Sequence, residues 1–134
     1  MKVVVRSVTD APAAFLAFGG EAPTVSRTGY ITAFARSLSR RSDPPEMAND
    51  DHLAEVFLLP LYRLLLRSPR LTRRIFDAAT PGAVAYFNAR TRHIDAIVRE
   101  QIAAGIDQVV VLGAGFDSRS MRFGEQLGQV RVFE

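Results

Sequence analysis

The sequence predicts a mixed α/β protein in which a helical segment precedes the beginning of a parallel sheet. Three observations carry this prediction. Apolar side chains recur at helical spacing through residues 28–104, an uninterrupted β-branched run follows, and a glycine-rich turn then leads toward a second apolar run. The order strand, turn, helix, strand is a βαβ unit, for which a parallel pair with a right-handed crossover is expected.

Changes in composition along the chain predict three parts. Residues 1–27 are weakly patterned and interrupted by Pro and Gly, so we expect a mobile or loosely docked arm, with a short strand at Val3–Val5 as its one element. Residues 28–80 are expected to form a helical segment. Residues 81–134 are expected to begin the sheet-bearing domain.

Proline and short polar residues suggest where the first helices begin and end. The segment 42–45 (Ser-Asp-Pro-Pro) is expected to end the first helix. Asn49 or Asp50 is suited to cap a short helix, and Pro60 to begin the next. Ser68-Pro69 has the form of an N-cap followed by proline at the first helical position.

The longest helix is predicted between Thr80 and Gly105. Thr80 is the expected N-cap, Pro81 the first helical residue, and Gly105 the glycine that follows the C-terminus. Apolar or small residues at steps of three and four draw one stripe along about six turns: Val84, Phe87, Thr91, Ile94 and Val98.

The predicted βαβ unit occupies the last 28 residues. Residues 107–112 contain the continuous apolar run Val109–Leu112, which predicts a strand buried on both faces. A short crossover helix is expected within 118–127, where Gly124 weakens the pattern, and a second strand over 129–133.

Composition favours a packed globular protein and excludes several kinds of site. Of the 134 residues 48% are hydrophobic and 23% charged, and no apolar run approaches the ~20 residues that cross a bilayer. A cytoplasmic protein without a membrane partner is therefore expected. The net charge is +3, but the arginines are dispersed, so no nucleic-acid partner is expected. Cys is absent and His occurs twice, so we expect neither a disulfide nor a metal site.

The turn Gly113-Ala114-Gly115 lies where open α/β sheets bind ligands, beyond the carboxyl end of a strand. Glu134 follows the second strand, 19 residues after Gly115, close to the spacing at which a carboxylate accepts hydrogen bonds from ribose hydroxyls. Position 118 is Ser where a dinucleotide fingerprint has its third glycine. The pattern therefore indicates an adenosine-type ligand without pyrophosphate, with a purely structural tight turn as the alternative.

Arg90 falls on the same face of the long helix as the apolar stripe. A desolvated guanidinium is costly unless it is paired. Three arrangements are open: an internal ion pair, for example with Asp117; a side chain that extends to solvent; or a bidentate pair with a ligand carboxylate.

The residues that define these features also resemble a known family. The stretches 86–92, 108–119 and 132–134 resemble the leucine carboxyl methyltransferase family, and especially its bacterial branch of S-adenosylmethionine-dependent methyltransferases, abundant in actinobacteria. Residues 51–55 are similar to the N-terminal helical region of that branch. The resemblance covers roughly residues 28–134.

The resemblance implies S-adenosyl-L-methionine as cofactor and roles for individual residues. Arg90 would hold the methionine carboxylate, the turn formed by Gly113, Ala114 and Gly115 would lie under the methionine and ribose, and Glu134 would bind the ribose hydroxyls. Asp117 would lie near the methionine end. It also implies a Rossmann-like class I methyltransferase sheet, with residues 28–80 as a helical cap over the acceptor pocket.

The implied reaction is direct SN2 transfer of a methyl group to an oxygen of a carboxylate or hydroxyl acceptor. Such chemistry depends mainly on alignment, so no catalytic residue is expected, and His93 is interpreted as a surface or hydrogen-bonded histidine. The acceptor and the oligomeric state are left open.

The resemblance also implies further strands after the position of Glu134, as in other members of the family. We therefore expect a truncated N-terminal portion that is inactive alone. A non-catalytic interaction module and an NAD(P)- or FAD-binding oxidoreductase are the alternatives.

Overall fold

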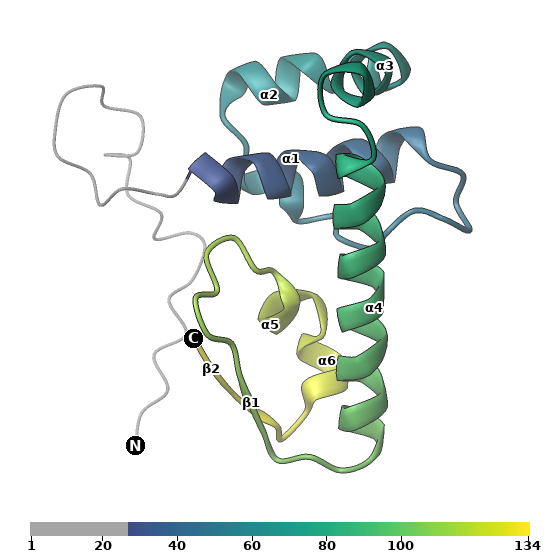
Figure 1. Cartoon of the computed structure of the whole chain (residues 1–134). Helices are drawn as coiled ribbons and strands as arrows, with labels where there is room; N and C mark the ends of the chain where they lie inside the picture. Colours follow the sequence, from purple (N-terminus) through teal and green to yellow (C-terminus); the bar gives the residue numbers. More distant parts are fainter. Residues whose placement is uncertain (1–26) are drawn as a thin grey trace, which may run out of the picture.

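A computed structural model describes residues 27–134 and shows a helix-rich α/β arrangement with a small parallel sheet (Figure 1). The expected arm, with its strand at Val3–Val5, lies outside the described residues except for Arg27, which begins the first helix. The elements are α1 (Arg27–Ser42), the 3-10 helix η3 (Ala54–Phe57), α2 (Pro60–Leu65), α3 (Pro69–Ala79), α4 (Ala83–Ala103), β1 (Gln108–Val110), α5 (Arg119–Arg122), α6 (Gly124–Leu127) and β2 (Arg131–Phe133).

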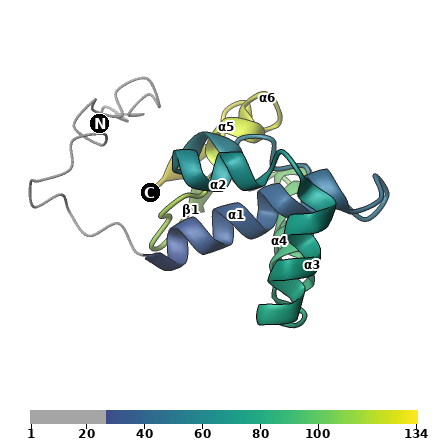
Figure 2. The same cartoon turned by 90° about the horizontal axis from the view of Figure 1, so that it is seen from above.

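Helix α1 is the centre of the helical part. It lies between α2 and α3 on one side and the sheet on the other, and it runs across the N-terminal half of α4 (Figures 1 and 2). Phe34 is buried and packs against the rings of Tyr62 and Phe76, with centroids 5.0 and 5.6 Å away. The core cluster consists of Ala33, Phe34, Ala35, Leu38, Leu58, Leu66 and Val84. Burial of these apolar surfaces holds the helices of this part together.

Two of the predicted helix starts need correction. The longest helix begins at Ala83 after Gly82 in the left-handed region (φ 77°), not at Pro81 with Thr80 as N-cap. The Thr80 hydroxyl instead donates to the carbonyl of Phe76 and so belongs to the end of α3. Neither Asn49 nor Asp50 caps a helix, because η3 begins later, after Leu53.

The predictions for the proline-started helices are confirmed in part. Pro60 occupies the first position of α2, and α1 ends at Ser42 as expected. Ser68 precedes Pro69 at the start of α3, but its side chain makes no capping hydrogen bond. The proline ring, with its fixed φ, is therefore the local reason for the start of α3.

The predicted apolar stripe of α4 is confirmed. Its members are buried or half-buried, and α4 contacts α1, α3 and α6 along this side. Two polar side chains share the buried surface. Asn88 is 7% exposed and Asp95 is 2% exposed, so this face of α4 is not simply hydrophobic.

The C-terminal part forms the predicted parallel βαβ unit. Gln108, Val109 and Val110 pair with Arg131, Val132 and Phe133. The crossover contains two four-residue helices in place of one, and Gly124 begins the second of them.

The expectation that the first strand is buried on both faces is wrong. Val110 is 62% exposed and Leu112 is 91% exposed. The neighbouring residues Val109 and Val111 are half-buried. Successive side chains of a strand alternate between faces, and within residues 27–134 the helices cover only the face toward α4.

Between Arg27 and Glu134 we find no helix that combines the length and the apolar character needed to cross a bilayer. In the same range, no group of three or more His, Asp or Glu side chains is arranged to hold a metal ion.

Candidate functional site

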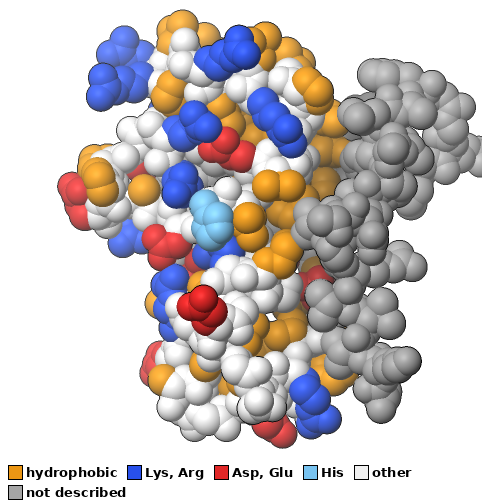
Figure 3. All heavy atoms as spheres, turned by 180° about the vertical axis from the view of Figure 1, so that it is seen from behind, with side chains coloured by type: hydrophobic (Ala, Val, Ile, Leu, Met, Phe, Trp, Pro, Cys, Tyr) orange, Lys and Arg blue, Asp and Glu red, His pale blue; other side chains and the backbone are white. Residues whose placement is uncertain are grey.

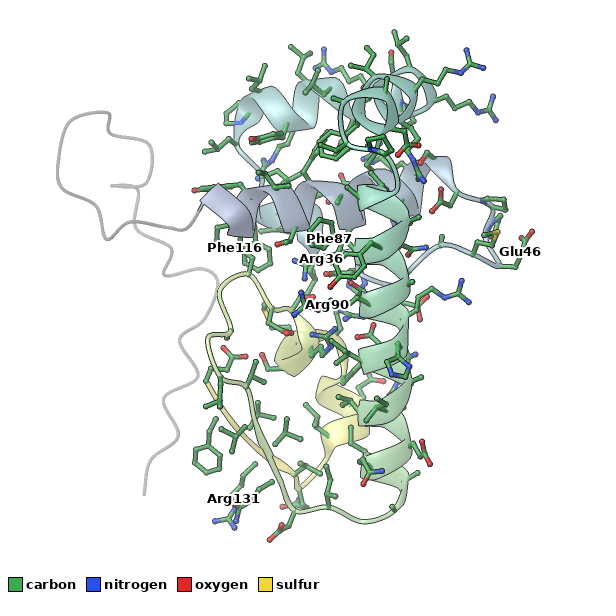
Figure 4. All side chains as sticks on the ribbon, in the orientation of Figure 1. Arg36, Glu46, Phe87, Arg90, Phe116 and Arg131 are labelled. Carbon is green, nitrogen blue, oxygen red and sulfur yellow. The ribbon has the colours of Figure 1, made fainter. Side chains whose placement is uncertain are left out.

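A cavity of about 540 Å³ opens between α4, α1 and the carboxyl end of β1. Its apolar part is formed by side chains of α4 and of the inner face of the sheet, and its polar part by side chains near the glycine turn. The predicted site residues that line it are Arg90, Gly113, Ala114, Gly115 and Asp117. The turn that follows β1 and the side of α4 thus face one another across this space (Figure 4).

The glycine turn depends on backbone conformation. Gly113 and Gly115 have φ values of 64° and 56°, a region that side chains with a Cβ rarely adopt. A Cβ added to Gly113 would meet no atom within 4 Å, so the constraint there is conformational and not steric. The turn is closed by the Asp117 amide, which donates to the carbonyl of Ala114 at 2.9 Å.

Arg90 extends from α4 toward the cavity and is exposed, so the premise of a desolvated guanidinium is wrong (Figure 4). At the position of Arg90, the α4 face that carries the apolar stripe borders the open cavity, so the guanidinium stays hydrated. Among residues 27–134 its side chain has no ion pair or hydrogen bond. The carboxylate of Asp117 is instead engaged by Arg119.

Asp117 is fixed at the start of α5 by a single neighbour. Its Oδ1 accepts the backbone N–H of Arg119 at 2.8 Å, and its Oδ2 accepts a short hydrogen bond from the guanidinium of the same residue. Both carboxylate oxygens are thus used in shaping the loop that follows the glycine turn.

Glu134 lies at the same edge of the sheet as the glycine turn but does not line the cavity. The parallel register pairs Val110 with Phe133, and the N–H of Val111 donates to the carbonyl of Phe133 at 2.8 Å. Glu134 therefore follows β2 beside the residues that lead into the turn. The hydroxyl of Ser120, which does line the cavity, donates to Glu134 Oε1 at 2.7 Å.

Phe116 attaches the glycine turn to the helical part. Its ring stacks on Phe57 with a centroid distance of 5.0 Å and meets the edge of Tyr30 at 4.9 Å. Its carbonyl accepts a hydrogen bond of 2.7 Å from the guanidinium of Arg36 on α1. Residues some 80 positions apart in the sequence thus hold the loop in place (Figure 4).

A buried ionic network that the sequence interpretation missed lies next to the cavity. Asp95 of α4 accepts hydrogen bonds from Arg119 at 2.7 Å and from Arg122 at 2.8 and 3.0 Å. Asp51, fully buried, accepts the hydroxyl of Ser118 at 2.7 Å. The three acidic members (Asp51, Asp95, Asp117) balance the three basic ones (Arg36, Arg119, Arg122), so the cluster is neutral.

Burial and ion pairing shift the pKa of the two most buried guanidinium groups, Arg36 and Arg122, in opposite directions. Burial lowers the pKa of Arg36, only partly offset by the charge of Asp51, whose Oδ2 is 3.2 Å away without hydrogen-bond geometry. Burial also lowers the pKa of Arg122, but the hydrogen bonds and charge of Asp95 outweigh it, so this pKa is raised. Both groups remain protonated at neutral pH.

One sequence signal pointed to the network. The buried residues of α4 are Val84, Asn88, Thr91 and Asp95, at steps of four and three, and the last of these is an acid at a core position. A carboxylate placed there requires a partner. The identity of the partner, 24 or more residues away, is not encoded in the spacing.

A glycine turn at the end of a parallel strand, with a cavity beside it, is typical of α/β proteins that bind small molecules. Residues 29–134 match the family model described as leucine carboxyl methyltransferase. The chain therefore belongs to the leucine carboxyl methyltransferase family.

Several actinobacterial proteins are similar to this chain. A protein of Mycobacteroides abscessus is 34% identical over 104 residues, which cover 74% of this chain and 32% of the relative. A protein of Streptomyces coelicolor is 35% identical over 114 residues, covering 82% and 37%. The names of both begin "Putative S-adenosyl-L-methionine-dependent methyltransferase". The chain thus spans about a third of the length of these relatives. No solved structure matches it.

Proposed function

We propose that this chain forms the S-adenosyl-L-methionine-binding part of a methyltransferase that transfers a methyl group to a carboxylate or hydroxyl oxygen. The observation that carries the proposal is the cavity that Arg90 and the Gly113–Gly115 turn share from opposite sides. The names of the relatives support the same cofactor. In this proposal the βαβ unit is the beginning of a Rossmann-like class I methyltransferase sheet.

The cavity fits the chemistry of such a cofactor. Its volume lies within the roughly 300–1,000 Å³ typical of small-molecule sites. The two left-handed glycines let the backbone approach a ligand without an intervening Cβ. Arg90 offers a guanidinium that no carboxylate of residues 27–134 neutralises, which suits the carboxylate of an amino-acid group.

Glu134 supplies the third recognition element in this proposal. One of its oxygens is held by Ser120, which leaves the other free to accept hydrogen bonds from ribose hydroxyls. The parallel register sets its distance along the sheet edge from the glycine turn. The carboxylate would therefore bind the sugar while Arg90 binds the amino-acid end.

Asp117 is assigned to shaping the loop, because Arg119 occupies both of its oxygens. When bound, the cofactor supplies a sulfonium methyl group that is already activated toward SN2 displacement. The residues of the chain then need only to hold, align and shield the reacting groups, so no acid, base or nucleophile is assigned. Residues 28–80 are proposed to cap the acceptor side, with residues 81–134 beginning the cofactor domain.

Ligand titration followed by NMR of the ¹⁵N-labelled chain tests the proposal, since chemical shifts detect even weak binding. S-adenosylhomocysteine is expected to shift the amide signals of Gly113 and Gly115. NADH serves as the control for the dinucleotide alternative and is expected to leave them unchanged. If millimolar S-adenosylhomocysteine moves neither glycine, or NADH moves both more strongly, the proposed function is wrong.

A further inference from the structure

The surface of α2 and α3 that points away from α1 is both apolar and basic. We define this α2–α3 outer face by five aliphatic and four basic residues. The aliphatic side chains are between 42% and 64% exposed. The members are Leu61, Leu64, Leu65, Leu71 and Ile75, together with the exposed Arg63, Arg67, Arg70 and Arg74.

The opposite side of the same helices already satisfies the needs of folding. Leu66 is 2% exposed and belongs to the core cluster, and Tyr62 and Phe76 pack against it and against the ring of Phe34 on α1. The outer aliphatic side chains are therefore additional to the core. Hydrophobic and basic side chains lie side by side at this end of the molecule (Figure 3). Exposed apolar clusters of this kind mark interaction surfaces.

The charge of the outer face has one sign. No Asp or Glu occurs between Glu55 and Asp77. Arg73, which points elsewhere, is neutralised by Asp43 and Asp77 at 2.7 and 2.6 Å.

The arginines of the face itself differ from Arg73. Arg63 donates to the carbonyl of Val56, and no acid of the described residues pairs with it. Among residues 27–134, Arg67, Arg70 and Arg74 have no carboxylate partner. Positive charge is thus left uncompensated where the aliphatic surface is exposed.

We propose that the α2–α3 outer face docks on the surface of an anionic phospholipid bilayer. Aliphatic side chains that enter the boundary between headgroups and acyl chains, flanked by basic side chains that meet lipid phosphates, are the features of an interfacial helix. The face contains four arginines and no acidic residue, so its charge complements the phosphates of anionic lipids. This peripheral docking departs from the expectation that the chain has no membrane partner.

Docking in this way leaves the candidate site accessible. Helix α1 separates α2 and α3 from the cavity, which lies on the other side of α1 beside α4 and β1 (Figure 1). The inference is therefore independent of the proposed function, because it concerns a different surface and a different ligand.

Co-sedimentation with vesicles tests the inference. The chain is expected to sediment with phosphatidylcholine vesicles that contain 30% phosphatidylglycerol, and much less with phosphatidylcholine alone. Replacing both arginines in R70Q/R74Q is expected to weaken partitioning about 30-fold, since each basic residue near an anionic leaflet contributes roughly fivefold. Salt at 0.5 M is expected to weaken it as well.

The matched control removes the same charge from other elements. R92Q/R131Q replaces two exposed arginines of α4 and β2 and is expected to retain binding. Far-UV circular dichroism verifies that each variant is folded. The inference is overturned if the chain does not sediment with anionic vesicles, or if both double variants lose equal affinity. A second copy of the chain is the alternative occupant of this face, and L71S/I75S tests it. If this variant loses self-association in ultracentrifugation but still binds vesicles, the inference is overturned.

Discussion

Asp95 provides the sharpest test of how α4 and the βαβ unit are held together. Its side chain is 3% exposed, and it accepts three hydrogen bonds from Arg119 and Arg122. Substitution by Ala leaves two buried guanidinium groups without their main partner. We expect the attachment of α4 to the βαβ unit to be weakened, because Asp95 comes from α4 and both arginines come from α5.

The size of the effect follows from the geometry. Removing one member of a buried ion pair costs about 3–5 kcal/mol. The lower end applies here, because Arg119 keeps Asp117, and Arg122 keeps Ser118 at 2.9 Å and Asp51 at 3.5 Å. Asp95→Ala should therefore lower the free energy of unfolding by about 3 kcal/mol. For a urea m-value of about 1.5 kcal/mol/M, the midpoint should fall by about 2 M.

The assay is urea unfolding followed by circular dichroism, with Asp50→Ala as the matched control. Asp50 also pairs with an arginine of the chain, Arg99 at 2.9 Å, but the two side chains are 71% and 41% exposed. An exposed pair contributes about 0–1 kcal/mol. If the two substitutions shift the midpoint by the same amount, the buried network does not stabilise the fold as argued.

Three further predictions concern the loop beside the cavity. Gly115→Ala should lower the free energy of unfolding by about 1 kcal/mol, because the φ of Gly115 is 56°. Gly124→Ala is the control and should leave stability unchanged or raise it, as measured by thermal melts. Equal effects of the two substitutions would contradict the conformational argument. Phe116→Ala should cost about 2–3 kcal/mol through loss of its two aromatic contacts, and an unchanged melting temperature would show that the loop is not anchored there. Ser118→Ala should cost about 1–3 kcal/mol by removing the donor to buried Asp51, and a chemical-denaturation midpoint equal to that of the parent would refute this.

Local patterns predicted the elements that depend on one stretch of chain. The 3.6-residue period of α4 identified its buried face, and the glycine pair identified the tight turn between β1 and α5, whose two glycines have positive φ. Both are properties of neighbouring residues. The start of α4 was misplaced because Thr80 and Pro81 have the form of a cap, while the Thr80 hydroxyl is used by the preceding helix.

Features that depend on residues distant in sequence were not predicted. Ser118 and Asp51 are hydrogen-bonded across 67 positions, and the ring of Phe116 packs on side chains of the helical part. No periodicity reports such pairs. The burial of β1 was overestimated for a related reason, because an apolar run shows what a strand could bury but not which elements cover it.

Binding of two ligands to Arg90→Ala tests the central claim most directly. S-adenosylhomocysteine carries an amino-acid carboxylate, and 5′-methylthioadenosine has the same nucleoside without it. We predict that Arg90→Ala weakens the affinity for S-adenosylhomocysteine about tenfold, the effect of losing one charge-assisted pair. The affinity for 5′-methylthioadenosine should be unchanged. Equal loss of both ligands, or loss of neither, would contradict the assignment of Arg90 and of the cavity that it lines.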